Sequence, residues 1–97
     1  MQHVKRIEIV VDSPEIPELL QVLRAHGIRG YTLFTHLRGG GDRGERFNDE
    51  PGGGNGNSCL LTAAEPAAVP ALVEAIQPIL RRRGGMCLIS DAQWVLH

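Results

Sequence analysis

A glycine-rich stretch at residues 38–57 separates two parts of this 97-residue chain that share the same order of predicted elements. The stretch reads RGGGDRGERFNDEPGGGNGN and contains eight of the twelve glycines of the sequence. On each side of it, the hydrophobic pattern predicts a strand, a helix and a second strand. The predicted strands are 4–12, 30–38, 58–65 and 86–96, and the predicted helices are 13–27 and 66–85. This repeated order leaves few folds open to so short a chain.

Each predicted helix has a single apolar stripe, which is typical of a helix that packs on a sheet. The stripes are Ile16, Leu19, Leu20 and Leu23 in the first helix, and Val69, Leu72, Val73, Ile76 and Leu80 in the second. Ser13 or Glu15 should begin the first helix, and Gly27 should end it in a left-handed conformation. Pro78 removes a backbone donor, so we expect the second helix to kink or end there.

The order of the elements predicts an α+β fold in which residues 1–97 form a single domain. The fold is the ferredoxin-like split βαβ arrangement (βαββαβ), an antiparallel four-stranded sheet with both helices on one face. Its second and third strands are neighbours, usually joined by a hairpin of about two to five residues. The glycine-rich stretch takes the place of this hairpin, so we expect a long loop that projects from one end of the sheet.

The sheet face away from the helices is predicted to expose apolar side chains, namely Val10, Phe34, Leu60 and Leu88. Such a face usually has a partner. We therefore expect a homo-oligomer, in which a closed ring would form identical clefts between neighbouring subunits. The glycine-rich loop and residues 81–85 need not touch within one subunit, so we expect a cleft between subunits to be their meeting point.

The composition argues against several classes of protein. Ten basic and eleven acidic residues give a formal charge of −1, which provides no basic surface for nucleic acid. Residues 1–11 lack the pattern of a secretion signal, and no apolar run is long enough to span a membrane. Cys59 and Cys87 are isolated, which indicates free thiols in a reducing, cytoplasmic compartment. Both cysteines fit core positions of strands.

No pattern of residues indicates catalysis or a metal site. The four histidines lack the spacing of metal ligands, and the sequence has no GxSxG motif for a nucleophilic serine. We therefore expect neither catalytic nor metal-binding residues. A small phosphate-handling enzyme of the same fold and a trimeric metal-binding protein are the alternatives.

Two glycine-containing motifs have the chemistry to bind an anion. In LRGGGDRG, residues 37–44, the amides of consecutive glycines can surround an anion, and Arg38 or Arg43 can add positive charge. In RRRGG, residues 81–85, guanidinium groups lie beside free amides, a combination that suits a phosphate. Each motif also has a simpler interpretation, as a flexible loop or as a helix end whose arginines interact with the helix dipole.

These motifs and the order of elements resemble the PII-like signalling proteins over essentially the whole chain, most closely the short carboxysome-associated PII-like class. The resemblance is carried by GYTLFTHLRGGGDRG at residues 30–44 and RRRGG at residues 81–85. It implies a homotrimer that binds an adenine nucleotide in each cleft between subunits. It also implies a T-loop at residues 39–57, which docks on a target protein, and a phosphate-binding B-loop at about 81–86.

The resemblance further implies two sets of site residues. The nucleotide-binding set is Gly39, Gly41, Thr62, Arg81, Arg82, Gly84 and Gly85. The set for a small anion, bicarbonate, is Arg38, Gly40 and Arg43.

The chain departs from the PII pattern in ways that bear on its ligands. Arg43 stands near the place of a glutamine that helps to hold Mg-ATP and 2-oxoglutarate, and Met86 near the place of the B-loop lysine. The stretch 38–57 contains no tyrosine, which excludes uridylylation there. These departures favour ADP or AMP over ATP, with bicarbonate as the second ligand and no covalent cofactor.

The implied function is a non-catalytic sensor that regulates a carbon-uptake or carboxysome-related partner through its T-loop. A bicarbonate transporter is one such partner, and the chain would reach the membrane only through it. We expect the loop tip, residues 45–57, to be mobile in the free protein because Phe47 is its only large apolar anchor. Ligand should order the loop base, residues 38–43.

Overall fold

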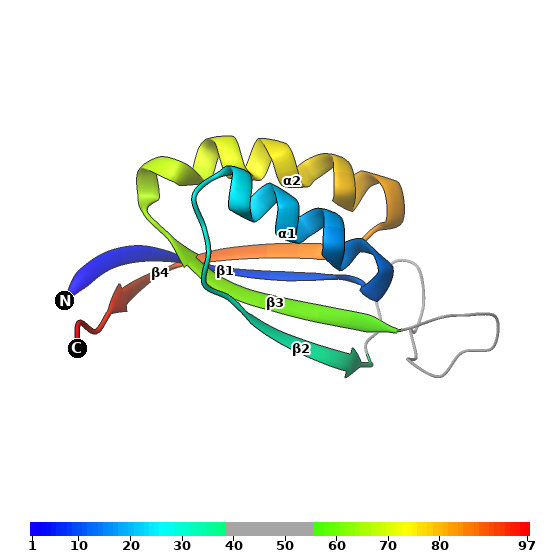
Figure 1. The fold of residues 1–97 in the computed structure, drawn as a ribbon, viewed down its shortest axis with the longest axis horizontal. Coiled ribbons are helices and arrows are strands. Elements are labelled where there is room, and N and C mark those ends of the chain that lie inside the picture. Colours follow the sequence, from blue (N-terminus) through cyan, green and yellow to red (C-terminus); the bar gives the residue numbers. More distant parts are fainter. Residues whose placement is uncertain (39–55) are drawn as a thin grey trace.

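The computed structural model describes residues 1–38 and 56–97 (Figure 1). Its strands are β1 (Gln2–Asp12), β2 (Thr32–Leu37), β3 (Asn57–Ala64) and β4 (Met86–Trp94). Its helices are α1 (Ile16–Ala25) and α2 (Val69–Arg83), preceded by the 3-10 turns η1 (Ser13–Glu15) and η2 (Pro66–Ala68). Four predicted site residues lie outside the described residues, namely Gly39, Gly40, Gly41 and Arg43. The predicted mobility of the loop tip and the predicted ordering of the loop base by ligand also concern residues that the structure does not describe.

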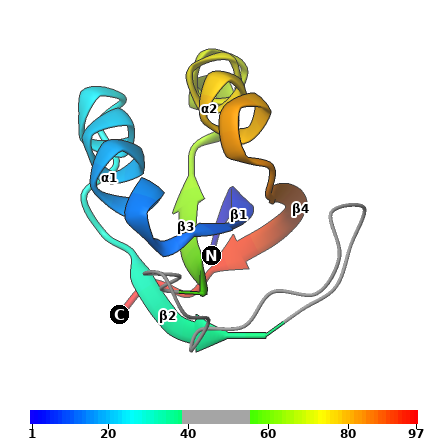
Figure 2. The ribbon, with the colours of Figure 1, turned by 90° about the vertical axis from the view of Figure 1, so that its right-hand side faces the viewer.

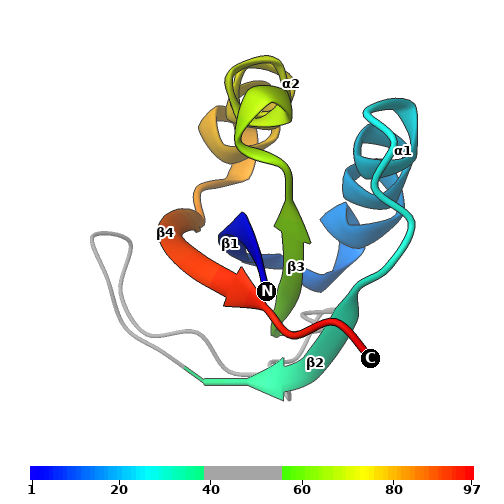
Figure 3. The ribbon, with the colours of Figure 1, turned by 90° about the vertical axis from the view of Figure 1, so that its left-hand side faces the viewer.

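The four strands form one sheet in the order β2-β3-β1-β4, and every neighbouring pair is antiparallel. Both helices cover the same face of this sheet (Figures 2 and 3). We call the other one the open face, because no helix of the described residues lies on it. The predicted ferredoxin-like α+β fold is confirmed.

Strand direction places the two glycine motifs at one end of the sheet. β1 and β2 run one way and β3 and β4 the other, because neighbours are antiparallel. Arg38 therefore follows the end of β2 at the same end of the sheet where Gly84 and Gly85 precede β4 (Figure 1). We call this the loop end. Both loops leave from the same end of one subunit, although from opposite edges of its sheet. The expectation that they meet between subunits stays a prediction.

The strand register assigns side chains to the two faces of the sheet. Leu33, Leu60, Ile9 and Cys87 form one row across the sheet on the helix face, and Phe34, Cys59, Val10 and Met86 form the next row on the open face. Leu60 is fully buried against the helices, so its predicted place on the open face was wrong. Adjacent Leu60 and Leu61 leave the alternation ambiguous, and the pairing of Leu60 with Ile9 decides it. Val10, Phe34 and Leu88 do lie on the open face.

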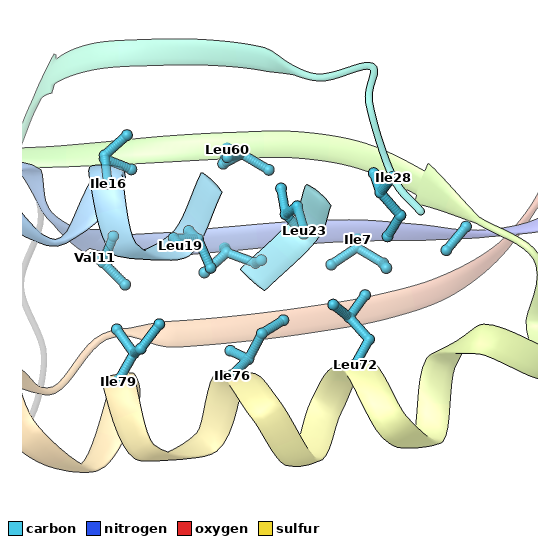
Figure 4. Packing of buried hydrophobic residues seen from close by; sticks show 12 residues of the cluster. Ile7, Val11, Ile16, Leu19, Leu23, Ile28, Leu60, Leu72, Ile76 and Ile79 are labelled. Atoms are coloured by element: carbon cyan, nitrogen blue, oxygen red, sulfur yellow. The ribbon is translucent and has the colours of Figure 1, made fainter. Parts of the chain in front are cut away.

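The core lies between the helix face of the sheet and the two helices (Figure 4). Its fully or nearly fully buried members include Ile7, Ile9, Val11 and Leu60 from the sheet, Ile16, Leu19 and Leu23 from α1, and Leu72, Ile76 and Ile79 from α2. Most of the predicted stripes are therefore confirmed. In α2, however, Ile79 occupies the buried position, while Leu80 is only partly buried beside it.

Helix α2 continues through Pro78 to Arg83, so the predicted end of the helix at the proline was wrong. Proline cannot donate to the carbonyl four residues earlier, which belongs to Glu74. Both Glu74 and Pro78 are exposed, so water can bind that carbonyl, and the burial of Ile76 and Ile79 on either side holds the helix in place.

The start of β3 shortens the predicted loop. Asn57 is buried as the first residue of β3. Ser13 holds Gly56, the residue before Asn57, because the backbone N–H and the hydroxyl of Ser13 donate to the Gly56 carbonyl at 3.0 and 3.2 Å. The Ser13 and Ser58 hydroxyl oxygens lie 2.7 Å apart. Ser13 thus begins η1 and ties the end of β1 to the start of β3. At the other end of α1, Gly27 has a φ of 80°, as predicted.

The two cysteines are free thiols on opposite faces of the sheet. Cys87 packs against the core, whereas the open-face position of Cys59 makes its predicted core placement wrong. Burial raises the pKa of both thiols, and Glu8 further raises the pKa of Cys59. None of the helices in the described part of the chain has the length and apolar character needed to cross a membrane.

Candidate functional site

The turn from α2 into β4 packs directly on the backbone of β1. Gly84 ends α2 with a φ of 81° and donates its N–H to the Leu80 carbonyl at 2.7 Å. Gly85 has a φ of 119°, and a methyl group on it would lie 2.5 Å from the carbonyl oxygen of Val10. A side chain at Gly85 would be both strained and in collision with the main chain. The two glycines thus hold the end of α2, with its three arginines, close against the sheet.

Arg82 joins the end of α2 to the beginning of α1. Its Nη2 donates to Glu15 Oε2 at 2.9 Å and to Glu18 Oε1 at 2.6 Å. Arg83 Nε lies 3.4 Å from Glu15 Oε1. Hydrogen bonding to Glu15, and then the charges of both glutamates, raises the pKa of Arg82 above its ordinary value. These ion pairs, more than the helix dipole, give the arginine run its structural role.

Arg81 is exposed, and it has no ion-pair partner within residues 1–38 and 56–97. It follows that the three arginines are unequal as candidate phosphate ligands. Arg81 can meet an anion without giving up a carboxylate, while Arg82 and Arg83 already contact Glu15.

At the opposite edge of the loop end, the last residues of β2 lead toward the glycine loop. The pairing of β2 with β3 is irregular between Phe34 and Leu37. His36 lies in this irregularity with a φ of 59°, which is uncommon for a residue with a side chain. Arg38 follows directly, exposed to solvent. Two central strands separate this edge from the Gly84–Gly85 turn.

Thr62 belongs to a different part of the molecule. Its hydroxyl donates to the Gly30 carbonyl at 2.6 Å. It lines a cavity of about 830 Å³ formed by the α1–β2 connection, residues 26–32, and by the end of β3, the beginning of β1 and the end of β4. We call this the far end of the sheet, since it is opposite to the loop end. Val4 lines this cavity and Val10 contacts Gly85, and six residues of strand span about 20 Å.

One subunit therefore holds Arg81, Arg82, Gly84 and Gly85 together at the loop end. Thr62 pairs with Ile7, three residues along β1 from Val10, and lines the cavity that extends to the far end. Sequence reasoning missed two participants at the loop end, Glu15 and Glu18. The antiparallel course of the two helices places the start of α1 beside the end of α2 (Figure 1). The sequence did contain a signal for these ion pairs. Two glutamates lie three residues apart at the start of α1, and three arginines end α2.

The sequence also matches known proteins. The family model of nitrogen regulatory protein P-II matches residues 4–96. The chain belongs to this family. No curated protein sequence is significantly similar to it.

Solved structures of PII-like proteins share the fold. CPII from Thiomonas intermedia K12, a nitrogen regulatory PII-like protein bound to ADP, AMP and bicarbonate, superposes with a TM-score of 0.87 at 22% identity. That match covers 95% of this chain and 88% of CPII. CPII bound to ADP and bicarbonate superposes with a TM-score of 0.83 at 23% identity, and the match covers 95% of this chain and 88% of CPII. A putative PII-like signalling protein from Thermus thermophilus gives 0.75 at 20% identity, over 94% and 88%.

Proposed function

We propose that this PII-family protein is a non-catalytic sensor that binds ADP or AMP between subunits of a homotrimer, together with bicarbonate. In this proposal, residues 1–97 act as one PII-like domain and the loop at about 39–57 carries the signal to a partner. The observation that supports an inter-subunit site most directly is the separation of the two candidate regions. The arginine-glycine turn packs on Val10, whereas the cavity that Thr62 lines extends to Val4 at the other end of β1. This separation favours a site shared by the turn of one subunit and the cavity of its neighbour.

The open face supplies a reason for the subunits to assemble. Phe34, Met86 and Leu88 are 49%, 45% and 53% exposed on it, together with Val10. Contiguous apolar surface of this kind is typical of an interface. We propose a ring built on this face, in which the arginine-glycine turn of one subunit lies beside the cavity of its neighbour.

Each ligand group has a proposed place. Arg81 and Arg82, with the amides of Gly84 and Gly85, hold the nucleotide phosphates at the loop end, where charge-assisted hydrogen bonds are strongest. Thr62 and the far-end cavity of the neighbouring subunit receive the rest of the nucleotide, and Gly39 and Gly41 complete this set.

Bicarbonate is proposed to bind where β2 enters the loop. Arg38 offers a guanidinium group that matches a planar anion, and Gly40 and Arg43 are proposed to add amide and charge contacts. CPII, which shares the fold, was solved with ADP and bicarbonate. The partner proposed for the loop is a carbon-uptake or carboxysome-related protein, such as a bicarbonate transporter.

Titration calorimetry with AMP, ADP and ATP, each with and without bicarbonate, tests this function. We expect binding of AMP or ADP that bicarbonate strengthens, and no hydrolysis of the nucleotide in the recovered sample. Arg81→Ala should weaken binding about 10-fold or more, the effect of losing a hydrogen bond to a charged group. Arg24→Ala, at the other end of α1, is the matched control. Absence of nucleotide binding, or its turnover, would contradict the proposal.

A further inference from the structure

The ion-pair cluster between α1 and α2 contains two carboxylates that the proposed function does not use. Glu15 and Glu18 lie one helical turn apart and accept hydrogen bonds from the same nitrogen of Arg82. They differ in exposure, because the Glu15 side chain is 10% exposed and that of Glu18 is 50% exposed. Gly84 follows these arginines directly, so both carboxylates lie close to the turn proposed to hold phosphate.

The cluster holds Arg82 where it is. A carboxylate as buried as Glu15 needs a cation or several hydrogen-bond donors to stay charged. Arg82 and Arg83 are the cations that contact it. An anion that drew Arg82 away would leave Glu15 with less compensation in a poorly solvated place. A phosphate that binds Arg82 should therefore use nitrogens other than Nη2 and leave the contacts with Glu15 and Glu18 in place.

The carboxylates also change the electrostatic field at the turn. Three arginines end α2, and two glutamates contact the second and third of them, which leaves one net positive charge at this helix end. Asp12, at the end of the adjacent β1, adds a further acidic side chain at the same end of the sheet. The energy of each phosphate group added to a nucleotide depends on this net charge, and not on the number of arginines alone.

We propose that Glu15 and Glu18 are specificity-determining residues that make the site discriminate against nucleotides with additional phosphates. They act through Arg82, by compensating its charge and holding its guanidinium group toward α1. AMP or ADP can use Arg81 and the glycine amides without disturbing the cluster. ATP brings more negative charge toward the same two carboxylates and gains little positive charge in return. The inference rests on the proposed nucleotide site and adds the residues that set its preference.

The test compares nucleotide affinities of the intact protein with those of Glu18→Gln. Glutamine keeps the size of the side chain, and the half-exposed position tolerates it. Calorimetric titrations with AMP, ADP and ATP give the ratio of ATP to AMP affinity for each protein. Loss of one nearby negative charge should raise this ratio about three- to tenfold at low salt, and the increase should shrink at high ionic strength. Glu15→Gln should act in the same direction.

Glu74→Gln is the matched control, because Glu74 is an exposed acid of α2 without an ion pair in the described part of the chain. It should leave the ratio unchanged. If the glutamates serve only to join the helices, their replacement will lower thermal stability and weaken all three nucleotides equally, and the inference is overturned. An unchanged ratio in a folded Glu18→Gln protein overturns it as well, although nucleotide binding itself stands. If the unmodified protein binds no nucleotide, the proposed function fails too.

Discussion

At Gly85 the chain passes close to the backbone of β1. The Val10 carbonyl oxygen occupies the space that a side chain would need, and the φ of 119° lies outside the range of ordinary residues. The same glycine was predicted from the sequence as part of a phosphate-binding turn. The structure supplies an independent reason for it, since any other residue would push α2 away from the sheet.

Alanine in place of a glycine can strain the backbone or collide with a neighbouring atom, and three glycines of this protein distinguish these two effects. Gly85→Ala combines backbone strain with a collision, so we expect it to lower the free energy of unfolding by about 2–5 kcal/mol. Gly27→Ala meets no atom within 4 Å but has a φ of 80°, and should cost about 1–2 kcal/mol. Gly30→Ala has neither problem and should be neutral or stabilising by about 0.4–1 kcal/mol.

Urea unfolding of the three variants at one protein concentration measures this series, because the stability of an oligomer depends on concentration. The essential result is the order of the loss in unfolding free energy, which should be largest for Gly85→Ala, smaller for Gly27→Ala and absent for Gly30→Ala. A Gly85→Ala protein as stable as Gly30→Ala would show that the turn does not pack on β1 as described.

At the scale of elements, α2 carries a proline in its interior and remains a regular helix. Glu74 and Pro78 are both exposed, which lets water reach the backbone there, while Ile76 and Ile79 on either side are buried against the core. Local propensity alone favoured a break. The packing of α2 on the sheet is worth more than the lost hydrogen bond.

Pro78→Ala should therefore stabilise the protein, because alanine restores the N–H donor to Glu74 within an existing helix. We expect a gain of about 1–3 kcal/mol in the free energy of unfolding. Pro70→Ala is the control, since Pro70 lies in the first turn of α2, where its missing N–H has no helical acceptor. Denaturant unfolding measures both. A loss of stability in Pro78→Ala would mean that the proline sets a shape of α2 that packing requires.

At the scale of the whole molecule, the sheet is covered by helices on one side only, and the open face carries a row of apolar side chains. A monomer would leave Phe34, Met86 and Leu88 in contact with water. In the proposed trimer, association through this face removes them from water. The proposed site is therefore a property of the assembly.

Leu88→Glu should convert the proposed trimer into monomers. Leu88 lies opposite Glu8 on the open face, so the variant loses about 1.5–3 kcal/mol of apolar burial per subunit and places two like charges side by side. Sedimentation equilibrium at micromolar concentration measures the change. Gln21→Glu, on the exposed side of α1, should remain trimeric. An unmodified protein that sediments as a monomer would contradict the trimer and the inter-subunit site together.

Much of this protein follows from patterns among neighbouring residues. The alternation in residues 4–12, the apolar stripe from Ile16 to Leu23 and the stop at Gly27 each depend on local geometry, so they could be predicted, and with them the order of elements and the family. The ligand roles of all the predicted site residues stay predictions, and those within residues 39–55 also lie outside the described structure.

What the tertiary structure decided concerns residues far apart in the chain. The face of Leu60 depends on its pairing with Ile9, and the position of Thr62 beside the cavity depends on its pairing with Ile7. Arg82 meets Glu15 across 67 positions of sequence. Such contacts arise when two amphipathic helices pack on one sheet, because burial of their apolar faces sets their relative position. Charged side chains then pair with the oppositely charged groups that this position brings close. No local pattern encodes that choice of partner.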